Sequence, residues 1–289
     1  MSAWPSMPSL VGRQVRYQLL SLWRTPIALF FTIILPLTML VIFNLLFGDE
    51  RVETPAGSWP IRQFYAGSIA AFTAVSATFT NLANIIPIRR EEGVLKRWRG
   101  TPLPPWAYVA GFIGSAVALA VIGVALMLGL GMVAYDVDID PAKVPAGVLT
   151  FVVGLATFAA LGVALASVVP TASAAPAAAN AALLPLAFIS DVFIPMENAP
   201  RWLEVVAGIF PLKPFVTSFQ NMLNPLVDAP GLDLEKLGVV AAWGVFGAVI
   251  ALTRFRWEPN PLGRQPRASR RSRSAPAGAT SPSEVVREA

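Results

Sequence analysis

The chain contains neither cysteine nor histidine in its 289 residues. The missing side chains include the thiol nucleophile, the commonest general base and the usual zinc ligands, so enzymes and zinc sites built on them are excluded. Charge is also scarce, because Asp, Glu, Lys and Arg make up 13% of the residues, against roughly 25% in an average soluble domain. This shortage argues against a water-soluble globular domain.

Apolar residues dominate instead, at 55% of the chain, and they are arranged in long runs. Crossing the hydrocarbon core of a bilayer takes about 20 apolar residues in a helix, so each long run is a candidate membrane span. We predict an all-α polytopic membrane protein with six transmembrane helices, at residues 27–47, 64–88, 107–135, 144–169, 171–194 and 237–253. The fourth and fifth runs are divided only by the segment VVPTAS, in which Pro170 breaks the helix.

Lys and Arg are unevenly distributed around these predicted spans. Most of the 22 lie in the N-terminal segment, in the loop after the second span and in the C-terminal tail. Cytoplasmic loops carry the excess of positive charge, so we expect a multi-pass protein with both termini in the cytoplasm. The first run begins only at residue 27, behind three Arg residues, and does not resemble a signal peptide.

Three regions follow from this layout. Residues 1–26 form a cytoplasmic N-terminal segment with a predicted interfacial helix, whose apolar positions are Val11, Val15, Leu19 and Leu22. Residues 27–256 form the transmembrane domain. Residues 257–289 are rich in Arg, Ser, Pro and Ala without periodic apolar positions, which predicts a disordered basic tail drawn to membrane lipids and not to nucleic acid.

The most charged short stretch is Arg89–Pro105, RREEGVLKRWRGTPLPP, between the second and third predicted spans. Glu92 and Lys96 are spaced as an i,i+4 pair, and the prolines at the end of the stretch stop a helix. The apolar residues between them form one strip: Val94, Leu95 and Trp98. The pattern predicts a short amphipathic helix outside the bilayer, and a charged hairpin that only fixes topology is the alternative.

The segment EEGVLKRWRGTPLPPWAYVAG resembles the cytoplasmic loop of the type-2 ABC exporter permeases, a family that includes daunorubicin-resistance permeases and many lipid or antibiotic exporters. In that family an acidic residue and a glycine precede Leu-Lys-Arg, and Thr-Pro-Leu leads into the third span. The matching positions are Glu92, Gly93, Leu95, Lys96, Arg97, Thr101, Pro102 and Leu103.

A second segment, FIPMENAPRWLEVVAGIFPLKPFV, is similar to the outer segment of the same family, so the resemblance extends to about Arg256. Its apolar residues follow the helical period: Trp202, Val205, Val206 and Ile209. The segment therefore predicts a helical hairpin on or in the outer leaflet.

The resemblance implies that the charged stretch is a coupling helix that docks on a separate ATPase. The residues implied are Glu91, Glu92, Gly93, Val94, Leu95, Lys96, Arg97, Trp98, Thr101 and Pro102. The implied partners are two ABC ATPase subunits and a second permease copy, in a homodimer or a related heterodimer. The chain has no GxxxxGK[ST] phosphate loop, so we expect no cofactor in it, with ATP and Mg²⁺ bound by the partner ATPase.

Polar residues follow one face of the second predicted span, and related G-subfamily transporters line a central cavity with their second and fifth spans. The candidate cargo pathway therefore comprises Thr73, Ser76, Thr80, Asn81 and Asn84, with Asn180 of the fifth span. Hydrogen bonds between helices, or from Thr and Ser to their own backbone, are the alternative. Pro185 is expected to kink the fifth span.

Asp191 is the one acidic residue inside the predicted spans. Because it lies close to Pro195 at the outer end, we interpret it as an interfacial residue that caps the outer helix, and a proton or cation site is the alternative. No charged pair crosses the predicted bilayer centre, which favours a hydrophobic or amphiphilic cargo over an inorganic ion.

Together with these patterns, the resemblance implies the permease subunit of an ATP-driven ABC exporter in a bacterial plasma membrane. It would move a lipophilic drug, antibiotic or lipid-like cargo out of the cell by alternating access, and would not itself be an enzyme. One alternative is a secondary multidrug or lipid transporter, although the charged second loop has no counterpart in a second half. A membrane-embedded lipid-modifying enzyme is the other, although it would need paired acids or histidine at the membrane surface.

Overall fold

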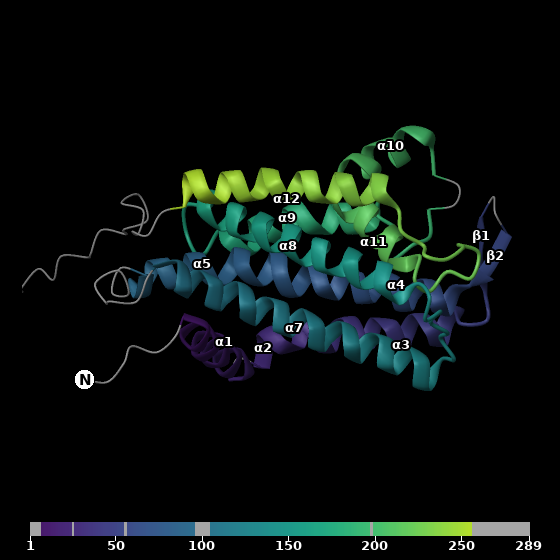
Figure 1. The fold of residues 1–289 in the computed structure, drawn as a ribbon, viewed down its shortest axis with the longest axis horizontal. Helices are drawn as coiled ribbons and strands as arrows, with labels where there is room; N and C mark the ends of the chain where they lie inside the picture. Colours follow the sequence, from purple (N-terminus) through teal and green to yellow (C-terminus); the bar gives the residue numbers. More distant parts are fainter. Residues whose placement is uncertain (1–6, 25, 55–56, 96–104, 197–198, 256–289) are drawn as a thin grey trace, which may run out of the picture.

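The computed structural model describes residues 7–24, 26–54, 57–95, 105–196 and 199–255. Long helices run along one common axis and a β-hairpin lies at one end of the bundle (Figure 1). The end that carries the hairpin is called the β-hairpin end, and the opposite end, where α1 lies and α5 and α12 finish, is called the α1 end (Figure 1). The predicted disordered tail, 257–289, lies outside the described residues.

The described residues are mostly helical, and they also form two π-helical turns and one pair of strands. The helices are α1 (Met7–Trp23), α2 (Pro26–Leu29), α3 (Leu35–Phe47), α4 (Ile61–Val75), α5 (Asn81–Glu91), α7 (Pro105–Ala134), α8 (Val144–Val168), α9 (Ala175–Phe188), α10 (Arg201–Ile209), α11 (Leu212–Gln220) and α12 (Leu234–Arg254). The π-helical turns are η1 (Phe30–Ile34) and η2 (Ser76–Thr80). The antiparallel strands are β1 (Arg51–Thr54) and β2 (Gly57–Pro60).

Five helices within the described residues are long and apolar enough to cross a membrane. They are Phe30–Phe47, Ile61–Glu91, Tyr108–Ala134, Val144–Val168 and Leu234–Arg254. Each agrees with a predicted span to within about one turn of helix. A run of apolar residues is a local property of the sequence, which explains why these helices could be located from the sequence.

The predicted span at 171–194 has a different structure. Its helix, α9, has only 14 residues, so it is about 21 Å long and shorter than the roughly 30 Å of a bilayer core. The prediction of six membrane-crossing helices is therefore not confirmed. Asp191 follows α9 in a left-handed backbone conformation, with φ 55°, which turns the chain away from the helix axis.

The predicted outer helical hairpin corresponds to α10 and α11. The predicted apolar face of α10 is exposed, and Trp202 is the most exposed of its residues at 66%. In contrast, α11 lies in the core against α4, α8 and α12, with Leu212, Phe215 and Val216 fully buried. This helix therefore belongs to the core of the bundle, whereas α10 lies at its surface.

The predicted N-terminal helix corresponds to α1, but its predicted apolar positions are not its most buried ones. Val15 and Leu19 are half-buried, and the side chains of Val11 and Leu22 lie outside what the structure describes. The structure does not test whether this helix lies at a membrane interface.

The buried side of α1 is formed by Gln14 and Gln18, at 7% and 4% exposure. This side packs along the first turns of α7, where glycines leave room for it. A Cβ atom at Gly111 would lie 2.7 Å from Gln14 Cβ, and one at Gly114 would lie 2.6 Å from Val15 Cγ2. The two helices can therefore approach closely only because these α7 positions lack a side chain.

Candidate functional site

The buried charge at the α1 end is Arg90, in the last turn of α5. Its side chain is 4% exposed and donates hydrogen bonds to Ala166 O at 3.2 Å and to Val169 O at 2.7 Å. Both carbonyls belong to the C-terminal end of α8, where backbone acceptors have no helical partner. Arg90 therefore caps α8 and fixes it to α5.

The neighbours of Arg90 connect α5 to two further elements. Arg89 pairs with Glu92 at 3.0 Å and donates to Ser21 Oγ of α1 at 3.3 Å. The Glu91 carboxylate accepts a hydrogen bond from Ala172 N at 2.6 Å, in the turn that leads into α9. Three consecutive side chains thus connect the end of α5 to α1, to α8 and to the start of α9.

The helix predicted for the charged stretch is interrupted at Gly93. The backbone there is left-handed, with φ 69°, and Gly93 N donates to Arg90 O at 3.1 Å. Glycine adopts this conformation without strain and commonly ends a helix in this way. Glu92 is paired with Arg89 in this structure, whereas its predicted partner Lys96 lies outside the described residues.

The predicted coupling residues are divided between described and undescribed parts of the chain. Leu95 is 1% exposed and belongs to a core cluster with Ile86 and Tyr108, and Val94 packs against the same cluster. In this conformation Leu95 holds the segment to the bundle and is not presented to a partner. The remaining predicted residues lie outside the described residues: Lys96, Arg97, Trp98, Thr101 and Pro102.

The polar stripe of the second span is divided by the π-helical turn η2. Thr73, before the turn, is fully buried and donates to Ile69 O at 2.7 Å. Its Cγ2 atom would lie 2.7 Å from a Cβ at Gly123, so Thr73 faces α7. For this residue the structure matches the alternative of a bond to its own backbone.

The later members of the stripe lie on a half-exposed side of η2 and α5: Ser76, Thr80, Asn81 and Asn84. Thr80 Oγ1 and Asn84 Oδ1 are inaccessible to solvent and have no hydrogen-bond partner among the described residues. A π-helical turn adds a residue to one turn and often marks a functional site. Asn180 is exposed on α9, which packs against η2 and α5.

A polar network at the β-hairpin end contains Asp191. Its carboxylate pairs with Lys213 of α11 at 3.3 Å and accepts from Met196 N at 2.8 Å. Its backbone carbonyl accepts from Ser68 Oγ of α4 at 2.9 Å, and Gln220 of α11 donates to that same hydroxyl. The network joins α4, the end of α9 and α11.

Sequence reasoning identified Asp191 but missed Lys213, Ser68 and Gln220. The only sequence signal for Lys213 is a cation in the otherwise apolar segment FPLKPF, which has no nearby acidic residue to explain it. An opposite charge elsewhere at membrane depth is the expected partner of such a residue.

Two of the cavities along the described residues lie between elements of the bundle. An apolar groove of about 510 Å³ lies between α8, α9 and α12, and Phe210 and Trp243 stack together in its wall. The second, of about 570 Å³, lies between α3, the start of α4 and the segment after α9, and we call it the hairpin-end pocket. No three Asp or Glu side chains that could hold a metal ion gather together in the described ranges.

The sequence comparisons agree with this architecture of long apolar helices. The family described as "ABC-2 type transporter" matches residues 11–223. The chain is 26% identical over 216 residues to the daunorubicin resistance ABC transporter permease protein DrrB1 of Streptomyces coeruleorubidus, covering 70% of this chain and 73% of that protein. It is also 26% identical over 207 residues to the putative transport permease ycf38 of Cyanophora paradoxa, covering 68% of each.

The class of protein is therefore a multi-pass helical membrane protein with a transport function. More particularly, the chain belongs to the ABC-2 type transporter family, as a membrane permease.

Proposed function

We propose that this permease is the transmembrane subunit of an ATP-driven exporter of a bacterial plasma membrane, with the α1 end in the cytoplasm. Two ABC ATPase subunits would bind ATP and Mg²⁺, and a second permease copy would complete the transporter. The cargo would be a lipophilic drug, antibiotic or lipid-like molecule, moved by alternating access. The similarity to DrrB1, a daunorubicin resistance permease, supports this class of cargo.

The observation that carries the proposal is the set of three contacts made by consecutive residues of α5. Arg89, Arg90 and Glu91 lie immediately before the segment expected to meet the ATPase, and each holds a different element. A force applied to that segment would therefore reach α1, α8 and α9 together. Transmission of motion between two sites requires such a contiguous set of contacts.

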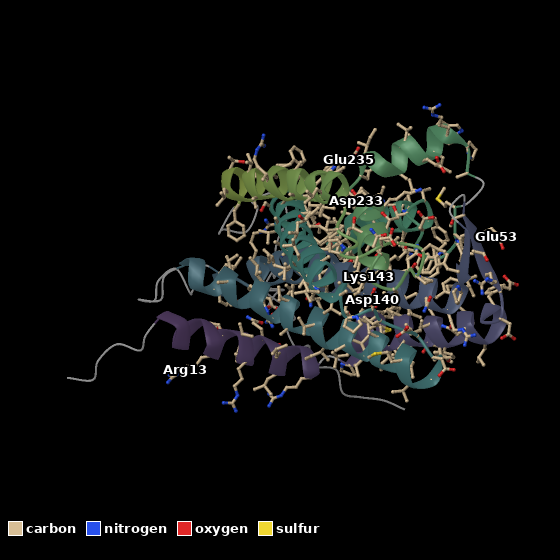
Figure 2. The ribbon with its side chains drawn as sticks, turned by 45° about the vertical axis from the view of Figure 1, so that its right-hand side comes forward. Arg13, Glu53, Asp140, Lys143, Asp233 and Glu235 are labelled. Atoms are coloured by element: carbon tan, nitrogen blue, oxygen red, sulfur yellow. The ribbon has the colours of Figure 1, made fainter. Side chains whose placement is uncertain are left out.

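The charge pattern supports the proposed orientation. The α1 end carries Arg13 and Arg16 on the exposed side of α1, in addition to Arg89 and Arg254. Figure 2 shows Arg13 projecting from α1 away from the bundle. An excess of Arg at one end of a helical bundle is typical of the cytoplasmic side.

The proposed cargo pathway is the half-exposed side of η2 and α5. Thr80 and Asn84 supply polar oxygen atoms there that no described residue satisfies. Such groups inside a membrane protein are functional candidates, because an unsatisfied polar atom is costly in hydrocarbon. Asn180 would contribute to the same wall from α9.

The test measures ATP hydrolysis and transport together in reconstituted lipid, with the permease co-purified with the ATPase encoded beside it. The probes are a lipophilic dye and a fluorescent phospholipid. Glu91→Gln weakens the contact to Ala172 N, and we expect less transport per ATP hydrolysed. Glu53→Gln, on the β-hairpin at the opposite end, is the matched control and should behave as wild type (Figure 2).

Two outcomes would overturn the proposal. One is that no ATPase co-purifies with the wild-type permease. The other is that Glu91→Gln transports as wild type at an unchanged rate of hydrolysis, which would leave the charged stretch as a determinant of membrane topology alone.

A further inference from the structure

The hairpin-end pocket changes in character along its length. Glu50 and Arg51 line it where the β-hairpin begins, and Met39 lines it further along α3. Met39 precedes Phe47 by about two turns, so the pocket reaches roughly 12 Å along the helix from its charged part. It is therefore polar at the end of the bundle and apolar inside it.

Aromatic rings from three segments form its middle part. The ring centroids of Phe43 and Tyr65 lie 5.0 Å apart, and those of Phe47 and Tyr65 lie 6.5 Å apart. Phe188 and Phe193 face the same pocket with centroids 5.5 Å apart. Rings arranged in this way around a cavity attract an organic ammonium group through their negative faces.

Two opposite charges stand beside these rings. The Glu50 side chain is exposed and has no ion-pair partner in the described part of the chain. Arg51 donates from Nε to Ser58 Oγ at 2.9 Å and from Nη2 to Ser58 O at 2.7 Å. A guanidinium has five N–H groups, so most of its donors remain for an anion.

A ligand that satisfies all of these groups must carry an ammonium, an anionic group and an apolar chain. A purely cationic amphiphile would place its charge beside Arg51, and an anionic lipid would place its charge beside Glu50. Aromatic residues at a membrane interface also occur without any ligand. That explanation covers the rings, but not a cavity with an unpaired carboxylate next to a guanidinium.

We propose that the hairpin-end pocket binds a zwitterionic phospholipid of the outer leaflet. Its phosphate contacts Arg51, its ammonium lies against Glu50 and Tyr65, and its acyl chain follows Phe43 and Met39 into the bundle. The assignment to the outer leaflet rests on the proposed orientation of the bundle, whereas the chemistry of the headgroup does not.

The experiment measures the lipids retained by the purified full-length permease by native mass spectrometry, without nucleotide or ATPase. Phosphatidylethanolamine, phosphatidylglycerol and tetraphenylphosphonium are the probes. We expect wild type to retain phosphatidylethanolamine several-fold over phosphatidylglycerol, and Glu50→Gln and Arg51→Gln to lose that preference. The control is Glu53→Gln, which makes the same substitution in strand β1 but outside the pocket. This variant should keep the lipid preference.

Three results would overturn the proposal. The first is an unchanged lipid preference in Glu50→Gln. Because the Glu50 side chain is exposed, this substitution should not disturb the fold. The second is tetraphenylphosphonium displacing the lipid in a manner that depends on Glu50 but not on Arg51, which identifies a simple cation site. The third is that wild type retains no phosphatidylethanolamine in this assay, because the pocket then holds no lipid in the absence of ATP and the ATPase. Because the assay contains no ATPase, a failure of the proposed coupling leaves its result unaffected.

Discussion

The two ends of the bundle use charged side chains in different ways. At the α1 end, Arg90 and Glu91 bind backbone groups of α8 and of the turn before α9. At the β-hairpin end, Asp191 is joined to a second helix through another side chain, Lys213, and its carboxylate's contact to backbone is local, to Met196 N. A side chain that binds backbone fixes a whole helix end, because the backbone cannot rotate away as a side chain can.

This difference bears on how the two ends would behave during transport. Contacts to backbone at the α1 end would keep α5, α8 and α9 moving as one body. The pair at the β-hairpin end joins two short segments through side chains, which can rotate apart more easily than a backbone group can. We therefore expect the α1 end to be the stiffer end, and the variants below test that expectation.

The largest effect is expected for Arg90→Ala. The substitution leaves the α8 carbonyls without their charged donor and opens a buried space, at a cost of about 2–4 kcal/mol. The measurement is the thermal unfolding midpoint of the purified protein in detergent, followed by tryptophan fluorescence. Arg13→Ala, which removes an exposed Arg of α1, is the control and should change the midpoint little. Equal midpoints for both variants would show that the α1 end does not depend on this buried contact.

A smaller loss is expected for Gly154→Ala in α8. A Cβ atom there would overlap the ring of Phe215 in α11, so the helices must separate, at a cost of about 1–3 kcal/mol. Gly129→Ala on α7 is the control, because a Cβ at that position meets nothing within 4 Å. We expect the control to be neutral or slightly stabilising, since alanine is the better helix former. Unfolding midpoints that coincide for the two variants would mean that α11 is not held closely against α8.

Sequence reasoning located the long helices because apolar run length is a local property. It could not locate the end of α9, because the chain beyond it is held by contacts to residues distant in the sequence, such as that of Asp191 to Lys213. Thr171–Ile194 is apolar enough for a span, and only the three-dimensional contacts show where its helix finishes.

The charged stretch shows a second limit of sequence reasoning. The stretch was predicted to be an amphipathic helix outside the bilayer, yet Arg90 is buried, because its carbonyl acceptors lie far away in the sequence, at Ala166 and Val169. The break at Gly93 was available as a signal, since a glycine after a run of helix-forming residues commonly ends a helix. The interpretation of a continuous helix gave more weight to the Glu92 and Lys96 spacing than to that glycine.

The pair at the β-hairpin end gives the next prediction. Asp191→Asn removes the charge but keeps an oxygen that can accept from Met196 N, so the loss should be about 1–2 kcal/mol. Lys213→Met should cost a similar amount, because Asp191 is then left without its ion-pair partner. The double variant should be less destabilised than the sum of the two single variants, in a double-mutant cycle of unfolding midpoints. Strict additivity would show that the two side chains are not energetically coupled.

The smallest effect concerns Asp233, the N-cap of α12, which accepts from Lys236 N at 3.1 Å and pairs with Lys236 Nζ at 2.9 Å. Burial alone would raise the pKa of Asp233, but these hydrogen bonds and the Lys236 charge lower the pKa below its ordinary value of 3.8. Stability from the carboxylate is therefore present above the unfolded pKa and is lost as the pH falls through the lower folded pKa.

Asp233→Asn keeps a good N-cap and removes only the titration. Its unfolding midpoint should lie slightly below that of wild type at neutral pH, and the difference should shrink as the pH falls below the ordinary pKa of 3.8. A difference that persists in acid would mean that Asp233 contributes through packing and not through charge. The charges at the β-hairpin end would then contribute little to stability even at the start of a long helix, in contrast to the charges at the α1 end.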